Sequence, residues 1–221
     1  MPKKYGVKEK DLVVAHVVNL ILTGKMRSGD RIDRNRIVKE LGLSRVPIQE
    51  AMVQLEHDGI ISTRYHRGAF VERFDEASIL EHHEVYGLLN GIASERAAAD
   101  PHCQIIDKLE SFLAAMKAST DAQSSQVSGW EYRHTIYDNY AGPRLVALIQ
   151  ASQSFMPQEF WPAYLAARDE MIAHYEEETD AIRRQDPPAA RAVNVRRAEV
   201  LGDLMRKELV RRGVLDTLNS E

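Results

Sequence analysis

The hydrophobic positions in the first third of the chain predict three short helices. Apolar residues recur at helical spacing over residues 8–22. Asp33 can cap a second helix that ends near residues 41–42, because its side chain can accept hydrogen bonds from the exposed N–H groups of a first helical turn. Ser44 can cap a third helix, from about residue 45 to residue 58, in the same way.

Two short runs of strand-forming residues follow, over residues 60–65 and 69–73. His66, Arg67 and Gly68 are predicted to form the turn between them, and Gly68 allows that turn to be tight. Three helices followed by a two-stranded hairpin predict a winged helix-turn-helix, in which the second helix of the motif enters the major groove of DNA. A winged helix that only bound protein would not need an arginine at the start of that helix and a basic hairpin.

The chain has helical periodicity almost throughout from residue 74 onward. The pattern predicts helices over residues 75–99, 102–119, 128–140, 143–155, 162–185 and 187–213. Small and aliphatic residues recur on one face of each helix, which is sufficient for the core of an all-α bundle. The predicted fold is therefore mainly α, with a winged helix-turn-helix at residues 1–73 and an all-helical domain at residues 74–221.

Charge is distributed unevenly between these two parts. Residues 1–73 contain 14 Lys and Arg against 9 Asp and Glu, which leaves 15 of the 29 basic and 24 of the 33 acidic residues for the remainder. This asymmetry indicates that only the first third meets a polyanion. The sequence shows neither a signal-peptide pattern nor an apolar stretch of about 18 residues, and Cys103 can form no disulfide within the chain. A cytoplasmic protein with no membrane partner is expected.

The start of the third helix carries the side chains best suited to base recognition. Arg45 can donate two hydrogen bonds to guanine O6 and N7, and Gln49, one turn later, can pair with adenine or accept from cytosine. Ser44 and the N-terminus of the helix suit a phosphate. Further DNA contacts are expected from the preceding helix and the hairpin, through Arg34, Arg36, Arg64, His66, Arg67 and Gly68.

Several segments resemble the GntR family of bacterial transcription regulators. They are residues 24–32, 41–52, 55–60 and 67–71. The family usually shows Ser-Arg-Thr-Pro-Val-Arg-Glu-Ala-Leu where this chain has Ser-Arg-Val-Pro-Ile-Gln-Glu-Ala-Met, so Gln49 replaces the second arginine. This replacement is expected to change base preference rather than abolish binding. The all-helical remainder resembles the effector-binding domain (FCD type) of the FadR subgroup.

The resemblance implies a homodimeric repressor or activator that binds a palindromic DNA operator. A small carboxylic acid would bind in the helical bundle and change how the two winged helices lie on the operator. Many members of the subgroup hold a divalent metal in the bundle through an Asp-x-x-x-His pair and two later histidines. The metal then contacts the carboxylate of the effector.

The metal ligands that the resemblance implies are largely missing here. His134 is kept, but Trp130 takes the position of the aspartate. Tyr175 and Arg197 take the positions of the later histidines, with His174 one residue away from the first of them. A metal needs several converging neutral or anionic ligands, and an arginine would repel it. No metal cofactor is therefore expected; if one were bound, His134 and His174 would be its ligands.

Arg197 is expected to replace the metal by offering a two-pronged guanidinium to the effector carboxylate. His134, Tyr175 and Asn139 would add hydrogen bonds, and Trp130 would supply a flat apolar wall. The alternatives are that His134 is a core histidine bonded to a neighbour and that Arg197 is an exposed helix residue.

Some features of the chain allow other interpretations. His82 and His83 are expected on a solvated helix face rather than at a ligand site. The whole protein could also be a helical-bundle enzyme, metal-dependent or not, joined to a DNA-targeting module. A third interpretation is an architectural DNA-binding protein that takes no effector and whose bundle only dimerises.

Overall fold

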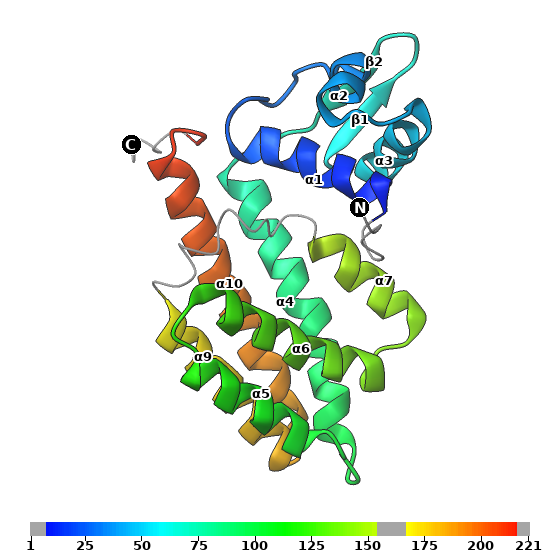
Figure 1. Ribbon diagram of the computed structural model, residues 1–221. Helices are drawn as coiled ribbons and strands as arrows, with labels where there is room; N and C mark the ends of the chain where they lie inside the picture. The colour runs from blue at the N-terminus through cyan, green and yellow to red at the C-terminus, as the bar shows by residue number, and fades with distance from the viewer. Residues whose placement is uncertain (1–7, 154–166, 216–221) are drawn as a thin grey trace, which may run out of the picture. The chain divides into compact units, whose positions relative to one another are not determined.

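The computed structural model describes residues 8–153 and 167–215 and is mainly helical (Figure 1). It divides into two compact units. The first unit comprises Met1–Ser78 together with Leu209–Glu221, and the second unit comprises Ile79–Glu208. The predicted fold class, a winged helix-turn-helix followed by a helical region, is confirmed. Within the described ranges, no helix is both long enough and apolar enough to cross a membrane.

The first unit contains the predicted three helices and hairpin in the predicted order. The helices are α1 (Glu9–Leu22), α2 (Arg34–Leu41) and α3 (Arg45–His57). The strands are β1 (Ile61–Arg64) and β2 (Gly68–Val71), which pair antiparallel. The core of this unit is formed by buried apolar side chains from all three helices and both strands: Val13, Val17, Ile21, Ile37, Ile48, Met52, Leu55, Ile61, Ala69 and Val71.

The helix caps in the first unit follow the sequence only in part. The Asp33 side chain accepts hydrogen bonds from the N–H groups of Asn35 and Arg36, as predicted for the start of α2. Gly42 ends that helix with a left-handed φ of 64°. Ser44 occupies the N-cap position of α3, but its side chain makes no capping hydrogen bond there. The prediction about Ser44 was therefore right about where α3 begins and wrong about how its first turn is capped.

The hairpin gains a third extended segment that the sequence pattern did not predict. The Gly29 N–H donates to the Val71 carbonyl and the Ile32 N–H donates to the Ala69 carbonyl, both at 2.9 Å. Arg31 forms an isolated antiparallel bridge with Phe70 between these two bonds. The segment before α2 thus lies along the outer edge of β2. The sequence does not predict this pairing, because it uses backbone groups of a segment too short to show an alternation of apolar and polar side chains.

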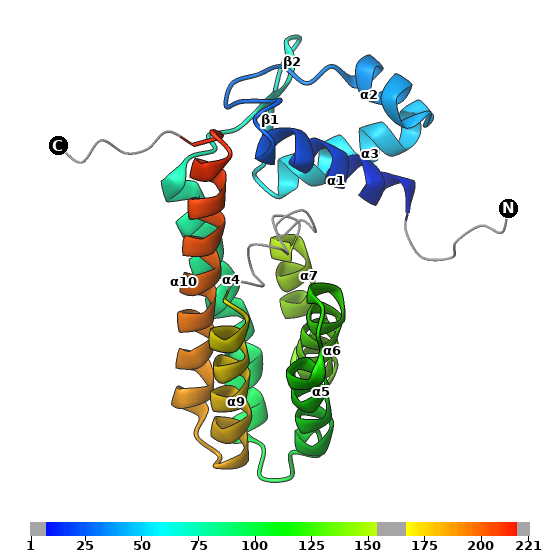
Figure 2. The same ribbon diagram turned by 60° about the vertical axis from the view of Figure 1, so that its left-hand side comes forward.

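The second unit consists mainly of antiparallel and crossing helices. In chain order they are α4 (Glu76–Ala99), which begins in the first unit, α5 (Ile106–Ala118), α6 (Ala122–Tyr140), α7 (Pro143–Ser152), α9 (Arg168–Arg183) and α10 (Pro187–Arg211), which ends in the first unit. Helix α5 packs against both α6 and α9, and Figure 2 shows it beside α6. The main core cluster includes Leu109, Tyr132, Ile136, Ile149 and Ile182.

The starts of α5, α6 and α9 (Arg168) differ from those predicted. Helix α6 begins at Ala122, within the polar segment expected to be a break, because the Asp121 side chain accepts from the Ser124 N–H at 2.8 Å and caps it. Gly129 lies within α6, where a larger residue would be crowded, because a Cβ there would lie 3.1 Å from the Tyr175 hydroxyl. Helix α5 begins at Ile106, four residues after the predicted start. The predicted residues 154–155 and 162–166 lie outside the described ranges.

The expectation that His82 and His83 lie on a solvated helix face was wrong for His83, and His82 is half-buried. His83 is 1% exposed, and its Nδ1 lies 2.8 Å from the Ile79 carbonyl oxygen. Burial lowers the pKa of both rings, that of His82 to about 4. Close packing is the cause, since a Cβ on Gly202 would lie 3.1 Å from the His83 side chain.

Candidate nucleic-acid interface

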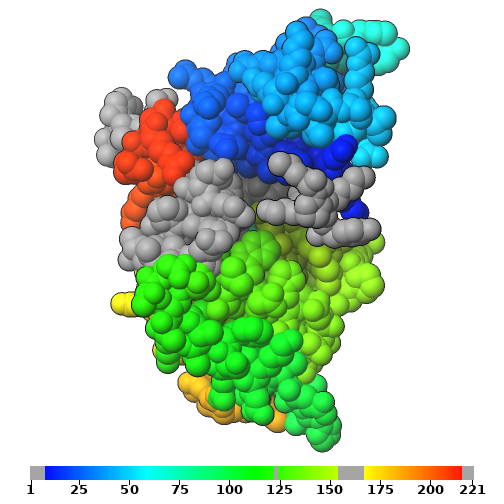
Figure 3. All heavy atoms as spheres, viewed as in Figure 1, coloured from blue at the N-terminus to red at the C-terminus, as the bar shows by residue number. Residues whose placement is uncertain are grey.

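The N-terminal ends of α2 and α3 and the start of β2 surround one concave surface. Its volume is about 770 Å³. The residues that line it are Arg31, Ile32, Asp33, Arg34, Asn35, Val38, Arg45, Ile48, Gln49, Gly68 and Ala69. We call this surface the α2–α3–wing concavity. Blue and cyan atoms of the first unit are visible at the molecular surface in the space-filling view (Figure 3).

Four of the predicted DNA-contacting residues line the α2–α3–wing concavity. They are Arg34, Arg45, Gln49 and Gly68. The Arg34 Nη1 donates to Gln49 Oε1 at 2.9 Å, so a side chain of α2 and a side chain of α3 are joined at this surface. The concavity carries three arginine guanidiniums but only one carboxylate, which already caps α2. Such a surface suits a polyanion.

Arg36 and Ser44 lie outside the residues that line the concavity. The Arg36 Nε donates to the Glu40 carboxylate at 2.7 Å, and the same carboxylate contacts the His16 ring at 3.0 Å. The hydrogen bond from Arg36 is the main cause that lowers the pKa of Glu40. Arg36 is thus an exposed ion-paired residue one turn along α2, and a phosphate contact there would compete with Glu40.

The hairpin presents its basic side chains to solvent. Arg64, His66 and Arg67 are all exposed, and the Arg64 guanidinium lies 4.5 Å from the centroid of the Phe70 ring. His66 has a φ of 56° and Gly68 a φ of 100°, both left-handed. The tight turn expected from Gly68 is present, and His66 takes part in it by adopting a conformation that few side chains adopt.

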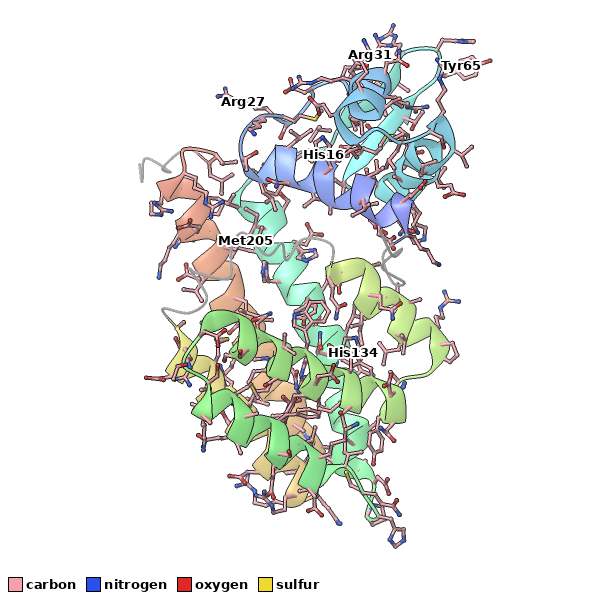
Figure 4. All side chains as sticks on the ribbon, in the orientation of Figure 1. His16, Arg27, Arg31, Tyr65, His134 and Met205 are labelled. Carbon is pink, nitrogen blue, oxygen red and sulfur yellow. The ribbon has the colours of Figure 1, made fainter. Side chains whose placement is uncertain are left out.

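Three further residues of the first unit, which sequence reasoning did not name, line the concavity or are exposed next to predicted DNA contacts. The Arg31 guanidinium lines the concavity next to Gly68, with its Nε 3.1 Å from where a Cβ on Gly68 would lie (Figure 4). Val46 is 66% exposed in the first turn of α3, and Tyr65 is 87% exposed at the hairpin turn. Position relative to Arg45 could have identified Val46, but Arg31 depends on the backbone pairing with β2.

A second cluster of charged side chains is buried in the second unit. Arg197 on α10 is 3% exposed, so the alternative of an exposed helix arginine is wrong. Its Nη1 donates to Glu178 Oε2 at 2.7 Å, and its Nη2 donates to Asn194. Arg133 on α6 is also buried and donates to the same two partners. We call Arg133, Glu178, Asn194 and Arg197 the buried arginine cluster.

The electrostatic balance in the buried arginine cluster keeps Glu178 ionised. Burial alone would raise the pKa of the Glu178 carboxyl, but the charges of Arg133 and Arg197 outweigh it and hold this pKa at about 2. The carboxylate also accepts from Asn194 Nδ2 at 2.9 Å and from the Ser94 hydroxyl. Arg197 was expected to bind the carboxylate of an effector. It is instead paired with the carboxylate of Glu178, a residue of the chain itself.

The other predicted effector-binding residues do not form a single cluster. The Tyr175 ring lies 4.6 Å from the Arg197 guanidinium and joins the buried arginine cluster. Trp130 stacks on His134 at 5.7 Å between ring centroids, and the His134 Nδ1 is bonded to the Trp130 carbonyl at 2.9 Å. Asn139 is exposed, and its amide donates to a carbonyl one turn back on α6, so the structure does not bring it to the others.

The residues of the second unit do not fit the metal centre that the family resemblance implies. Nowhere in residues 8–153 and 167–215 do three or more His, Cys, Asp or Glu side chains gather in a way that could hold a metal ion. Arg197, at the position of an expected histidine, is a buried cation bonded to Glu178. His174, near the expected position of another, has a pKa lowered by burial and then by the charge of Arg197.

Comparisons with known proteins agree with this geometry. Residues 10–71 match the family described as bacterial regulatory proteins, gntR family. The chain is 60% identical over 215 residues to the uncharacterised HTH-type transcriptional regulator Rv0043c of Mycobacterium tuberculosis strain H37Rv, an alignment that covers 97% of this chain and 88% of that protein. A regulator found in the TAR-I ttuE–ttuC′ intergenic region of Agrobacterium vitis is 30% identical, over 51% of this chain and 66% of its own length.

Solved structures show the same fold at low sequence identity. A GntR-family regulator from Pseudomonas syringae is 15% identical, with a TM-score of 0.57 over 93% of this chain and 88% of its own. McbR/YncC of Escherichia coli is 19% identical, with a TM-score of 0.56 over 94% of this chain and 98% of its own. With its winged helix-turn-helix and a nearly full-length relative at 60% identity, this chain belongs to the GntR family of bacterial transcriptional regulators.

Proposed function

We propose that this regulator binds a palindromic operator as a homodimer, with the α2–α3–wing concavity facing the DNA of each half-site. The observation that supports this most directly is the gathering of Arg31, Arg34, Arg45 and Gln49 at one exposed surface. Arg45 lies in the first turn of α3, where the side chains of a helix-turn-helix meet base edges, and its exposed guanidinium can donate to guanine O6 and N7.

The proposal is tested by selecting duplexes from a randomised library with the purified full-length protein. We expect the wild type to enrich one palindromic sequence, and Arg45→Ala to weaken binding to it by about 1–3 kcal/mol. Arg184→Ala is the matched control, because Arg184 is an exposed arginine of the second unit. Equal binding by both variants would mean that Arg45 does not contact the bases.

Dimerisation supplies affinity that a single winged helix lacks, because one such module contacts only a few base pairs. Leu80, Val85 and Leu88 leave apolar area exposed on one side of α4, at 42%, 46% and 37%. We propose that this side of α4 contributes to the homodimer. Val85→Glu should shift the protein toward the monomer in light-scattering chromatography, whereas Val127→Glu, at a 52% exposed position on α6, should not.

The second unit is proposed to be an effector domain of the FadR (FCD) type that binds a small carboxylate. The support is a charge imbalance: among the buried residues of the described chain, Arg133 and Arg197 face the single carboxylate of Glu178. Burying an uncompensated cation costs several kcal/mol, so an anion bound nearby would stabilise the unit. Tyr175, His134 and Trp130 are proposed to line the position of that anion.

A thermal-shift screen with small mono- and dicarboxylates tests the effector. A ligand that binds only the folded protein must raise the melting temperature. We expect at least one monocarboxylate to do so, and Arg197→Met to remove the shift. A flat response across the library, with operator binding intact, would favour an architectural protein that takes no effector.

A further inference from the structure

The hydrogen bond between Arg34 and Gln49 orients the Gln49 amide. Arg34 Nη1 lies 2.9 Å from the amide oxygen of Gln49. A guanidinium has only donors, so the atom of the amide that faces it must be the oxygen and not the nitrogen. The Gln49 Nε2 is therefore directed away from Arg34, and Gln49, an exposed residue, lines the α2–α3–wing concavity together with Arg34.

This orientation limits what Gln49 can offer to a base. An adenine is recognised by a glutamine that donates to N7 and accepts from N6 at the same time, which requires both ends of the amide to face the base. With its oxygen held by Arg34, the amide offers mainly its two N–H groups. The remaining N–H groups of Arg34 are also donors, so the pair as a whole presents donors to the groove.

Guanine has the acceptors that complement this set of donors. In the major groove, guanine shows two acceptors, O6 and N7, whereas adenine and cytosine each show an amino donor that needs an acceptor. We propose that Arg34 and Gln49 act as one base-recognition unit, in which Arg34 sets the orientation of the Gln49 amide and so selects guanine over adenine and cytosine. This inference rests on the proposed DNA-binding surface, and it assigns a base preference to that surface.

Arg34 is a positioning residue in this scheme, although it can also contact DNA. Its place at the first position of α2 is set by the Asp33 cap, which anchors the start of that helix. Gln49 lies one turn after Arg45 on α3, so the base it meets neighbours the one that Arg45 contacts. The specificity of α3 thus depends on the helix before it.

Selection from a randomised duplex library, repeated with variants of the full-length protein, tests the inference. Gln49→Ala identifies the operator position that depends on Gln49, because preference is lost there. We expect the wild type to prefer guanine at that position. Arg34→Ala frees the amide oxygen, and the ratio of adenine to guanine there should rise about tenfold. Arg34→Lys keeps a donor beside Gln49 and should keep guanine.

Lys39→Ala is the matched control, since Lys39 is an exposed cation on the same helix and does not line the concavity. It should leave base preference unchanged at every position. If Arg34→Ala weakens binding to all sequences alike and keeps the wild-type preference, Arg34 only contacts phosphate and the inference is wrong. A wild type that already prefers adenine there also overturns it. A wild type that enriches no sequence would contradict the DNA-binding proposal itself.

Discussion

Arg45 in the first unit and Arg197 in the second unit carry the same side chain in opposite environments. Arg45 is exposed at the start of α3, whereas Arg197 is 3% exposed and bonded to Glu178 and Asn194. The exposed guanidinium of Arg45 can offer its donors to a partner outside the protein. A buried one must be paired, because an unpaired charge in the interior is costly. Exposure and partners, rather than residue type, therefore separate an arginine that can contact DNA from one that organises a core.

The largest expected effect would come from removing the carboxylate of the buried arginine cluster. Glu178→Ala leaves Arg133 and Arg197 without their shared anion and should lower the free energy of unfolding by about 3–5 kcal/mol. Urea denaturation measures this. Glu177→Ala, at the neighbouring exposed ion pair with Arg196, should cost about 0–1 kcal/mol. If both variants lose a similar free energy of unfolding, the buried pairs of Glu178 stabilise the protein no more than the exposed pair of Glu177.

Acid should weaken the second unit through the same carboxylate. The pKa of Glu178 is about 2 in the folded chain, below the ordinary value of 4.5. A lowered pKa stabilises the folded state fully above the ordinary value, and this contribution is lost as the pH falls from 4.5 toward 2. The stability gap between the wild type and Glu178→Gln should therefore narrow over that range in urea denaturation. A gap that stays constant over that range would mean that the pKa of Glu178 is not lowered in the folded chain.

A smaller effect is expected at the turn of the wing. Gly68→Ala places a Cβ at a φ of 100° and 3.1 Å from the Arg31 Nε, so it should cost about 1–2 kcal/mol of stability and displace Arg31 from the concavity. Operator affinity should fall along with the melting temperature. Gly142→Ala is the control, because its φ is −70° and no atom lies within 4 Å of the added Cβ. An unchanged affinity for Gly68→Ala would place the operator away from the wing.

The smallest effect concerns the exposed apolar residue of α3. Val46 is 66% exposed beside Arg45, where its methyl groups can contact the methyl group of a thymine. Replacing that thymine by uracil in the operator should weaken wild-type binding by about 1 kcal/mol. The same replacement should have no effect on Val46→Ala. If both proteins respond equally to uracil, Val46 does not face the bases.

The candidate DNA-binding side chains could be predicted because their signals are local. The order of helices and hairpin, Arg45 and Gln49 one turn apart, and Gly68 in the turn are all visible within a few residues of each other. Arg31 was missed because its place depends on backbone pairing with β2. The sequence could not predict which end of the Gln49 amide is available to a base, because its hydrogen-bond partner, Arg34, lies on another helix.

The predicted effector residues fared differently because they come from distant segments. Arg133 and Glu178 are 45 positions apart, and no pattern in the sequence indicates that they meet. Their meeting depends on how α6, α9 and α10 pack, and it gives Arg197 a carboxylate from within the chain. Asn139 was predicted to join them and instead bonds to its own helix, because it lies on an exposed side of α6.

The sequence alone determined that the chain begins with a winged helix-turn-helix, continues as a helical bundle, and carries arginine at the start of α3. Periodicity, caps and turn glycines act over a few residues, so they can be recognised without a structure. Tertiary structure alone decided which polar side chains are paired: Arg34 is hydrogen-bonded to Gln49 at the surface, and Arg133 and Arg197 are ion-paired with Glu178 in the core. The physical reason is that hydrogen bonds between side chains require contact in space, and packing rather than sequence distance brings them together.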